Sequence, residues 1–449
     1  MFVRRICIIF IFCVAAQLYA QDSVDKKTCQ IHVYVHGTYG SAFSFISLPW
    51  VKKDALKGTT YVSLQRKMRS SQLAQYRRLM GDHGLTEVTP GICLPETHPI
   101  HYVADALRLI HREVNVHDTS EQRHFLFGWS GLLSQHERRY ASIRLYNELV
   151  ALVERVKAEG KIPVLKLYAH SHGGNVLLNL ALVDACAFDL ASLPPLTQPD
   201  VVSSMQKLFI DGAEWYKKPT QRLQASIFAT FLATPVQQET APLVVSPFFT
   251  RVLHIYSEND GIMASDFISS SRQSVMLFDD VLVQGHASIK TIRWMNGRTP
   301  LDDSLLEPLK KSRLGPLKNL SRKRINRIKN GGGNPDCPYP NDPTHADFWS
   351  VGNKRDGAFF EEVPLLIYMP LVEHLLPMVG DAQRLDFCLT DEDDSIGGAL
   401  FAYNDQQKPE LKAMKLISNE PLLEARQGIQ EVLNVSKKLT INVKLTLPF

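Results

Sequence analysis

Apolar positions along this chain fall into short runs that alternate with longer segments of helical periodicity. The runs are rich in Val, Ile, Leu, Phe and Tyr, and most of them stop at Gly, Pro or polar residues, as buried strands do. We predict strands at residues 30–36, 124–129, 163–168, 227–233, 251–256 and 288–294.

Two segments between these runs have the pattern of helices. In residues 137–158 the leucines at 145, 149 and 152 recur at spacings of four and three, and Gly160 follows the last turn. A second helix is expected from Gly174 to Cys186, directly after a strand. Strands that alternate with helices predict an α/β fold, with a mostly parallel sheet flanked by helices. Ligands of such sheets bind beyond the carboxyl ends of the strands, so the residues that follow each strand matter most.

Two regions depart from this alternation. Residues 310–329 hold nine Lys or Arg and no acid, and a Gly- and Pro-rich stretch follows. We interpret residues 297–344 as a solvated surface insertion. Residues 439–447 alternate strictly between apolar and polar side chains, which predicts a half-buried strand, either at the sheet edge or in a small appended unit.

The first twenty residues predict an export signal. Arg4 and Arg5 precede an apolar run of eleven residues, and Ala20 offers a small residue for cleavage. We therefore expect a secreted or periplasmic protein that is cut after Ala20, with an uncleaved anchor as the alternative. Five cysteines remain in the mature chain, enough for up to two disulfides, whose pairing the sequence does not give.

Composition narrows the class of protein further. The 449 residues are 45% hydrophobic and 21% charged, which excludes a low-complexity or largely disordered chain. The formal net charge of +4 is small for this length and gives no electrostatic reason to expect nucleic acid as a partner. The cysteines lack the Cys-x-x-Cys spacing of zinc sites, so they indicate no metal centre.

The most informative segment reads Leu-Lys-Leu-Tyr-Ala-His-Ser-His-Gly-Gly-Asn over residues 165–175. A predicted strand runs into a predicted helix, and Ser171 sits at the turn between small residues at 169 and 173. This is the Gly-x-Ser-x-Gly nucleophile elbow with Ala169 in its first position. Such a turn lifts a serine hydroxyl clear of the sheet and places it at a helix N-terminus, where backbone N–H groups favour a developing oxyanion. His170 and His172 could also begin a metal motif, but two glycines follow and no third ligand is near, so we expect neither metal nor cofactor.

Further candidates for acyl-transfer chemistry follow other predicted strands. Thr38 comes just after the first strand, where a second oxyanion-hole N–H is needed, and Asp260 follows the strand at 251–256. The chain order of serine, then acid, then histidine is the order that this kind of sheet requires. Two histidines remain as the general base, His286 and His345.

Together these motifs resemble those of the α/β-hydrolase superfamily, in its lipase and esterase branches, over about residues 30–350. Two further segments are similar to that family: Phe-Gly-Trp-Ser-Gly at 127–131, followed by Arg138 or Arg139, and Leu-Ala-Thr-Pro at 232–235.

The resemblance implies Ser171 as nucleophile, Asp260 as the acid, and an oxyanion hole formed by the backbone N–H groups of His172 and Thr38. It places the histidine in a loop after the last strand, before a closing helix that we expect within residues 363–378. We therefore prefer His345 and keep His286 as the alternative.

The expected function is that of a secreted serine hydrolase that cleaves carboxylic esters. The alternative is an inactive protein of the same fold that binds a lipid or a protein partner. The substrate would be a small-molecule or lipid ester, with peripheral membrane contact left open, and the sequence indicates no oligomeric state. We divide the chain into a signal peptide, a hydrolase core, the basic insertion, and a region with the histidine loop, closing helix and C-terminal extension, at residues 1–20, 21–296, 297–344 and 345–449.

Overall fold

The computed structural model describes residues 27–37, 84–88, 100–131, 135–211, 216–237, 239–260, 288–296, 300, 342–345, 347–349, 364–392, 395–404, 406, 408–420, 422–423 and 426–428. Several predictions fall outside these residues: the signal peptide, the basic stretch at 310–329, the strand at 439–447, Thr38 and His286.

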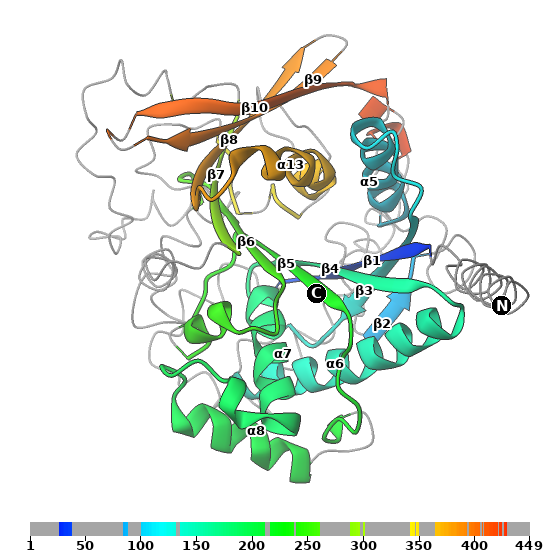
Figure 1. Cartoon of the computed structure of the whole chain (residues 1–449), viewed down its shortest axis with the longest axis vertical. Coiled ribbons are helices and arrows are strands. Elements are labelled where there is room, and N and C mark those ends of the chain that lie inside the picture. Colours follow the sequence, from blue (N-terminus) through cyan, green and yellow to red (C-terminus); the bar gives the residue numbers. More distant parts are fainter. Residues whose placement is uncertain are drawn as a thin grey trace, which may run out of the picture.

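The strands of the described residues form one ten-stranded sheet with the order β10-β9-β8-β7-β6-β5-β4-β1-β3-β2 (Figure 1). In chain order they are β1 Thr28–Val35, β2 Gly84–Glu87, β3 Glu121–Gly128, β4 Ile162–His170, β5 Ser226–Leu232, β6 Arg251–Tyr256, β7 Ile289–Asn296, β8 Arg384–Glu392, β9 Ser395–Tyr403 and β10 Pro409–Ser418. Every pairing from β3 across to β8 is parallel, and the pairings of β2, β9 and β10 are antiparallel. The predicted α/β class with a mostly parallel sheet is therefore confirmed.

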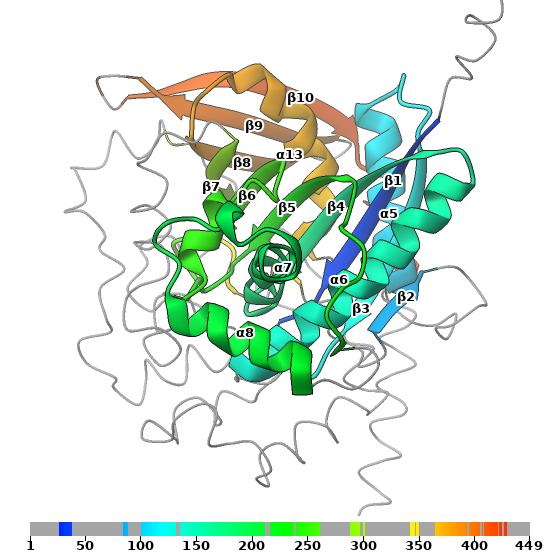
Figure 2. The ribbon, with the colours of Figure 1, turned by 60° about the horizontal axis from the view of Figure 1, so that its bottom comes forward.

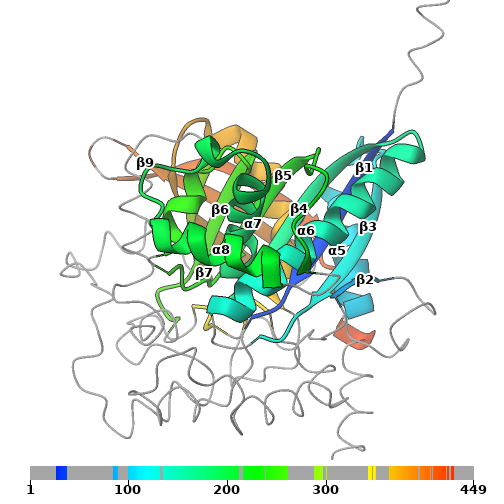
Figure 3. The same cartoon turned by 90° about the horizontal axis from the view of Figure 1, so that it is seen from below.

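Helices cover both faces of this sheet. On one face lie α6 Gln135–Ala158, α7 Gly173–Phe188 and α8 Pro199–Asp211, with the 3-10 turns Leu190–Ser192 and Ala241–Val245 (Figures 2 and 3). On the other face lie α5 Ile100–Val114 and α13 Met369–Leu375 (Figure 1).

Strand periodicity explains why two separate cores form. Successive side chains of β1 point to opposite faces. Ile31, Val33 and Val35 pack in the cluster that contains the apolar sides of α6 and α7, whereas Tyr34 packs with α5 and α13. The second face also carries His32, which is buried.

The closing helix is shorter than expected. In place of one helix over 363–378 there are a 3-10 turn at Leu365–Tyr368, then α13, and then a 3-10 turn at Leu376–Val379. Pro370 and Pro377 each lie in the first turn of a new segment, where a missing N–H costs no hydrogen bond. The prolines therefore divide the predicted helix rather than abolish it.

The region after residue 345 adds more to the sheet than its sequence suggested. Strand β8 extends the parallel sheet beside β7, and β9 and β10 follow as antiparallel neighbours. Hydrophobic periodicity does not predict these three strands, nor β2 and α5.

Two of the cysteines pack in the core as thiols. Cys29 and Cys186 are buried and form no disulfide in the described part of the chain.

Candidate active site

Ser171 lies at the turn between β4 and α7, in a backbone conformation that residues other than glycine rarely adopt. Its φ is +52°, in the left-handed region. Two hydrogen bonds stabilise the turn: the Ser171 N–H donates to the carbonyl of Leu232 over 3.0 Å, and the Ser171 carbonyl accepts from the N–H of Gly174 over 3.0 Å. A strained, over-determined serine between a strand and a helix is typical of functional sites.

Close packing explains the glycines around this serine. A Cβ on Gly173 would lie 2.5 Å from the carbonyl oxygen of His36 and 2.8 Å from that of Val35. A Cβ on Gly37 would lie 2.6 Å from the Cβ of Ser171. The end of β1 and the elbow therefore approach each other too closely for any side chain. Ala169 lies inside the strand, paired with Val35, so a methyl group fits there.

Asp260 and His345 contact each other at the carboxyl ends of the parallel strands, the end of the sheet at which Ser171 also lies. Asp260 follows β6 and is fully buried, and its Oδ2 lies 2.9 Å from Nδ1 of His345, a side chain that is only 11% exposed. A carboxylate accepts the Nδ1 proton, which leaves Nε2 as the basic nitrogen of the neutral ring. This is the tautomer that a general base next to a serine requires.

The segment that carries His345 is anchored to the ends of two strands. The Asn259 side chain donates to the carbonyl of Asp342 over 2.7 Å, and the N–H of Asn296 at the end of β7 donates to Oδ1 of Asp342 over 3.3 Å. Within the segment, the N–H of Thr344 donates to the carboxylate of Asp347 over 2.7 Å. These bonds join a residue far along the chain to the β6 and β7 ends.

Buried polar side chains stabilise the first turn of α7. His172 is the N-cap residue of α7 and is 2% exposed. Asn175 donates to the carbonyl of Pro235 over 3.0 Å and accepts from the N–H of Gln237 over 3.2 Å. Arg138, which is fully buried, donates to Oε1 of Gln237 over 2.5 Å.

The sequence left open whether Arg138 or Arg139 belongs to the family-like segment, and their contacts differ. Arg138 donates to Gln237, whose N–H in turn donates to Asn175 of α7, whereas Arg139 donates to Ser204 on α8.

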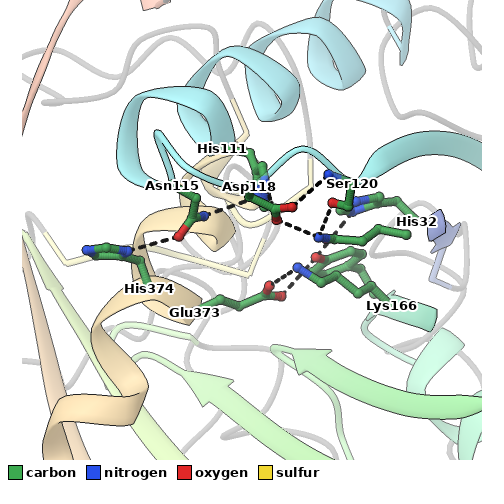
Figure 4. Close-up of polar contacts among 10 residues, drawn as sticks. His32, His111, Asn115, Asp118, Ser120, Lys166, Glu373 and His374 are labelled. Carbon is green, nitrogen blue, oxygen red and sulfur yellow. Dashed lines mark hydrogen bonds and ion pairs between the residues drawn. The ribbon is translucent and has the colours of Figure 1, made fainter. Parts of the chain in front are cut away.

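A second polar group lies on the other face of the sheet, between the sheet, α5 and α13 (Figure 4). We call it the α5–α13 polar cluster; it comprises Gln30, His32, His111, Asn115, Asp118, Ser120, Lys166, Tyr168, Glu373 and His374. Its contacts include an ion pair of 2.6 Å between Lys166 and Glu373, and His111 donates to Asp118 over 2.9 Å. His374 bonds to Asn115 over 3.0 Å, as expected for a satisfied helix residue.

Burial keeps several imidazoles of this sheet uncharged. It lowers the pKa of His32 well below its ordinary value and lowers the pKa of His124, which stacks on His32 at 4.6 Å, to about 3. Burial also lowers the pKa of His254 on β6 to about 3. Burial therefore keeps all three of these rings neutral at ordinary pH.

Among the described residues, no group of three or more His, Cys, Asp or Glu side chains is placed to hold a metal ion. None of the described helices has both the length and the apolar character needed to cross a membrane.

Comparison with known proteins adds little to this geometry. No protein family model and no curated protein matches the chain. Among solved structures, one similar chain comes from the structure of the Tle1 effector bound to the VgrG spike from the type 6 secretion system, with 8% identity and a TM-score of 0.23. That match covers 54% of this chain and 46% of the other, so this chain spans less than half of the length of its match. A likeness at this level carries no argument about function.

Several residues of the site carry no signal in the sequence that marks them as functional. Asn259 adjoins the predicted acid, and Trp349 follows the predicted histidine, but nothing in the sequence links either to its partner. His170 belongs to the elbow motif, but the motif does not indicate its partner. Its contact with the backbone of His345 spans 175 positions, which local patterns do not encode.

Proposed function

We propose that this protein is a serine hydrolase of the α/β-hydrolase kind that cleaves carboxylic esters, with Ser171 as nucleophile, His345 as general base and Asp260 as the acid. The observation that carries the proposal is a serine in the left-handed conformation between β4 and α7, together with the 2.9 Å hydrogen bond between Asp260 and His345 near the same sheet edge.

The chemistry follows from the roles of these three groups. Nε2 of His345 accepts the Ser171 proton as the hydroxyl oxygen attacks the ester carbonyl. Asp260 holds the imidazole in the required tautomer and stabilises the imidazolium. The imidazolium then returns the proton to the departing alcohol, and water cleaves the acyl-enzyme by the same steps in reverse order.

Oxyanion stabilisation would come from backbone donors. The N–H of His172 stands at the N-terminus of α7, where the helix dipole favours negative charge. We assign the second donor to the N–H of Thr38. With the predicted export signal, the substrate would be a small-molecule or lipid ester met outside the cytoplasm, and contact with a membrane surface would fit a lipid substrate.

Labelling with a serine-reactive fluorophosphonate tests the proposal directly. We expect the mature wild-type protein to be labelled, and the Ser171→Ala variant neither to be labelled nor to hydrolyse a series of acyl esters of increasing chain length above about one-thousandth of the wild-type rate. Chelators should leave the wild-type rate unchanged. Ester hydrolysis that survives in Ser171→Ala would contradict the assignment. A folded wild-type protein that is neither labelled nor active would favour the inactive binding protein.

A further inference from the structure

His170 occupies the position next to the candidate nucleophile and is almost entirely enclosed. It is the last residue of β4 and is 8% exposed. On one side it adjoins Gly37, since a Cβ on that glycine would lie 3.2 Å from Nδ1 of His170. Its ring therefore has little freedom to turn.

The other side of the ring contacts the segment that carries the candidate base. Nε2 of His170 lies 2.8 Å from the backbone carbonyl oxygen of His345. Because a carbonyl oxygen only accepts, Nε2 carries the proton and donates it. The ring also stacks on Trp349, with centroids 5.7 Å apart and planes 9° apart, and lies 4.7 Å from the ring of His345. The His170 side chain thus contacts this segment twice, by a hydrogen bond to the His345 backbone and by stacking on Trp349.

The value of this contact lies in how it connects the base to the nucleophile. Asp260 orients the His345 ring, but Asp260 follows β6, and β5 lies between β6 and β4. If Asp260 were the only link, the distance between His345 and Ser171 would depend on how β4, β5 and β6 pack together. The hydrogen bond from His170 joins the His345 backbone to the residue that is covalently next to Ser171. The separation between the two reacting groups is then set over a much shorter path.

We propose that His170 is a positioning residue, which fixes the His345 backbone relative to Ser171 through its Nε2–H and its stack on Trp349. This inference rests on the proposed function for its catalytic consequence, although the positioning itself does not require activity. Errors of about 1 Å in the placement of a catalytic group cost about a hundredfold in rate. Loss of the hydrogen bond should therefore lower turnover and leave substrate binding nearly unchanged.

Two variants of His170 and one control separate positioning from stability. His170→Phe keeps a ring to stack on Trp349 and removes the donor, whereas His170→Gln keeps an amide donor at a similar reach and removes the ring. The control is His124→Phe, which removes a buried imidazole from β3, outside the Ser171, Asp260 and His345 group. Each protein is assayed for kcat and KM with an acyl ester and for melting temperature. Proton NMR follows the deshielded Nδ1–H that His345 shares with Asp260, identified by its absence in Asp260→Asn.

We expect His170→Phe to lower kcat by about tenfold to a hundredfold with KM within about twofold, and to broaden or abolish the deshielded resonance. His170→Gln should recover much of kcat and the resonance, and His124→Phe should change neither. His170→Phe with wild-type kcat and an unchanged resonance would overturn the proposal, as would a His170→Gln variant that folds and is as impaired as His170→Phe. If the wild-type protein neither labels at Ser171 nor cleaves esters, the proposed function fails, and the resonance alone then decides whether His170 positions His345.

Discussion

At the elbow, two glycines determine the position of the candidate nucleophile. Ser171 can take its strained conformation because Gly173 and Gly37 allow the end of β1 to pack against the turn. A substituent at either glycine would have to push backbone or the serine itself aside. Gly173 belongs to the elbow motif that the sequence marks, but only the packing distances explain why glycine is required at both positions.

Gly173→Ala should therefore damage both the fold and the site. Its Cβ would meet backbone carbonyls, which cannot rotate away, so we expect a loss of about 1–3 kcal/mol in the free energy of unfolding and a loss of ester hydrolysis. Urea denaturation and a rate assay measure the two effects. The matched control is Gly160→Ala: at φ +75° it strains the backbone, but no atom lies within 4 Å of its new Cβ, so it should cost stability without changing the rate. Equal rates for the two variants would show that the crowding at Gly173 does not matter.

At the scale of elements, α13 is attached to the sheet by charge as well as by apolar packing. Lys166 of β4 pairs with Glu373 of α13 over 2.6 Å, and the hydroxyl of Tyr168 donates to the same carboxylate over 2.9 Å (Figure 4). The Lys166 and Glu373 side chains are only 14% and 10% exposed. Desolvation therefore offsets much of their attraction, and the pair serves to orient α13 more than to add net stability.

A double-variant cycle tests this reading. Glu373→Leu leaves the Lys166 ammonium and the Tyr168 hydroxyl without their carboxylate in a largely buried place, so we expect it to cost about 3 kcal/mol in the free energy of unfolding. Lys166→Met in the same background should restore part of that loss, because the unpaired charge is gone. Additive costs in urea denaturation would contradict the idea that the two groups act as a pair.

For the whole molecule, the buried neutral histidines predict sensitivity to acid. Burial lowers the pKa of His32, His124 and His254 in the folded protein, whereas in the unfolded chain each titrates near 6.5. Between the folded and unfolded values, the unfolded chain binds the protons that the folded one does not. The free energy of unfolding therefore falls as the pH drops below about 6.5, and the fall continues toward about 3.

The expected size of this effect is about 1.4 kcal/mol per histidine at one pH unit below 6.5, or about 4 kcal/mol for the three together. Urea denaturation at several pH values between 8 and 5 measures it. His124→Phe should make the slope smaller, because it removes one of the histidines whose pKa burial lowers. A free energy of unfolding that stays level from pH 7 to pH 5 would be inconsistent with this account.

Local sequence by itself determined the central α/β alternation and the elbow. The strand runs at 163–168 and 251–256, the helix after Gly174 and the serine between Ala169 and Gly173 all follow from hydrophobic period and turn chemistry, which act over a few residues. The predicted strands and helices of this central region correspond to β1 and β3–β7, with α6 and α7, to within a few residues.

Tertiary structure alone decided which distant groups meet. His345 lies 85 positions from Asp260 and 175 from His170, and the sequence could not choose between His345 and His286 from spacing. Only the anchoring of the 342–349 segment to the ends of β6 and β7 brings its histidine to Asp260. The strands β8–β10 escaped prediction for the same reason: each of them is defined by the strands it pairs with, and those partners come from other parts of the chain or from one another.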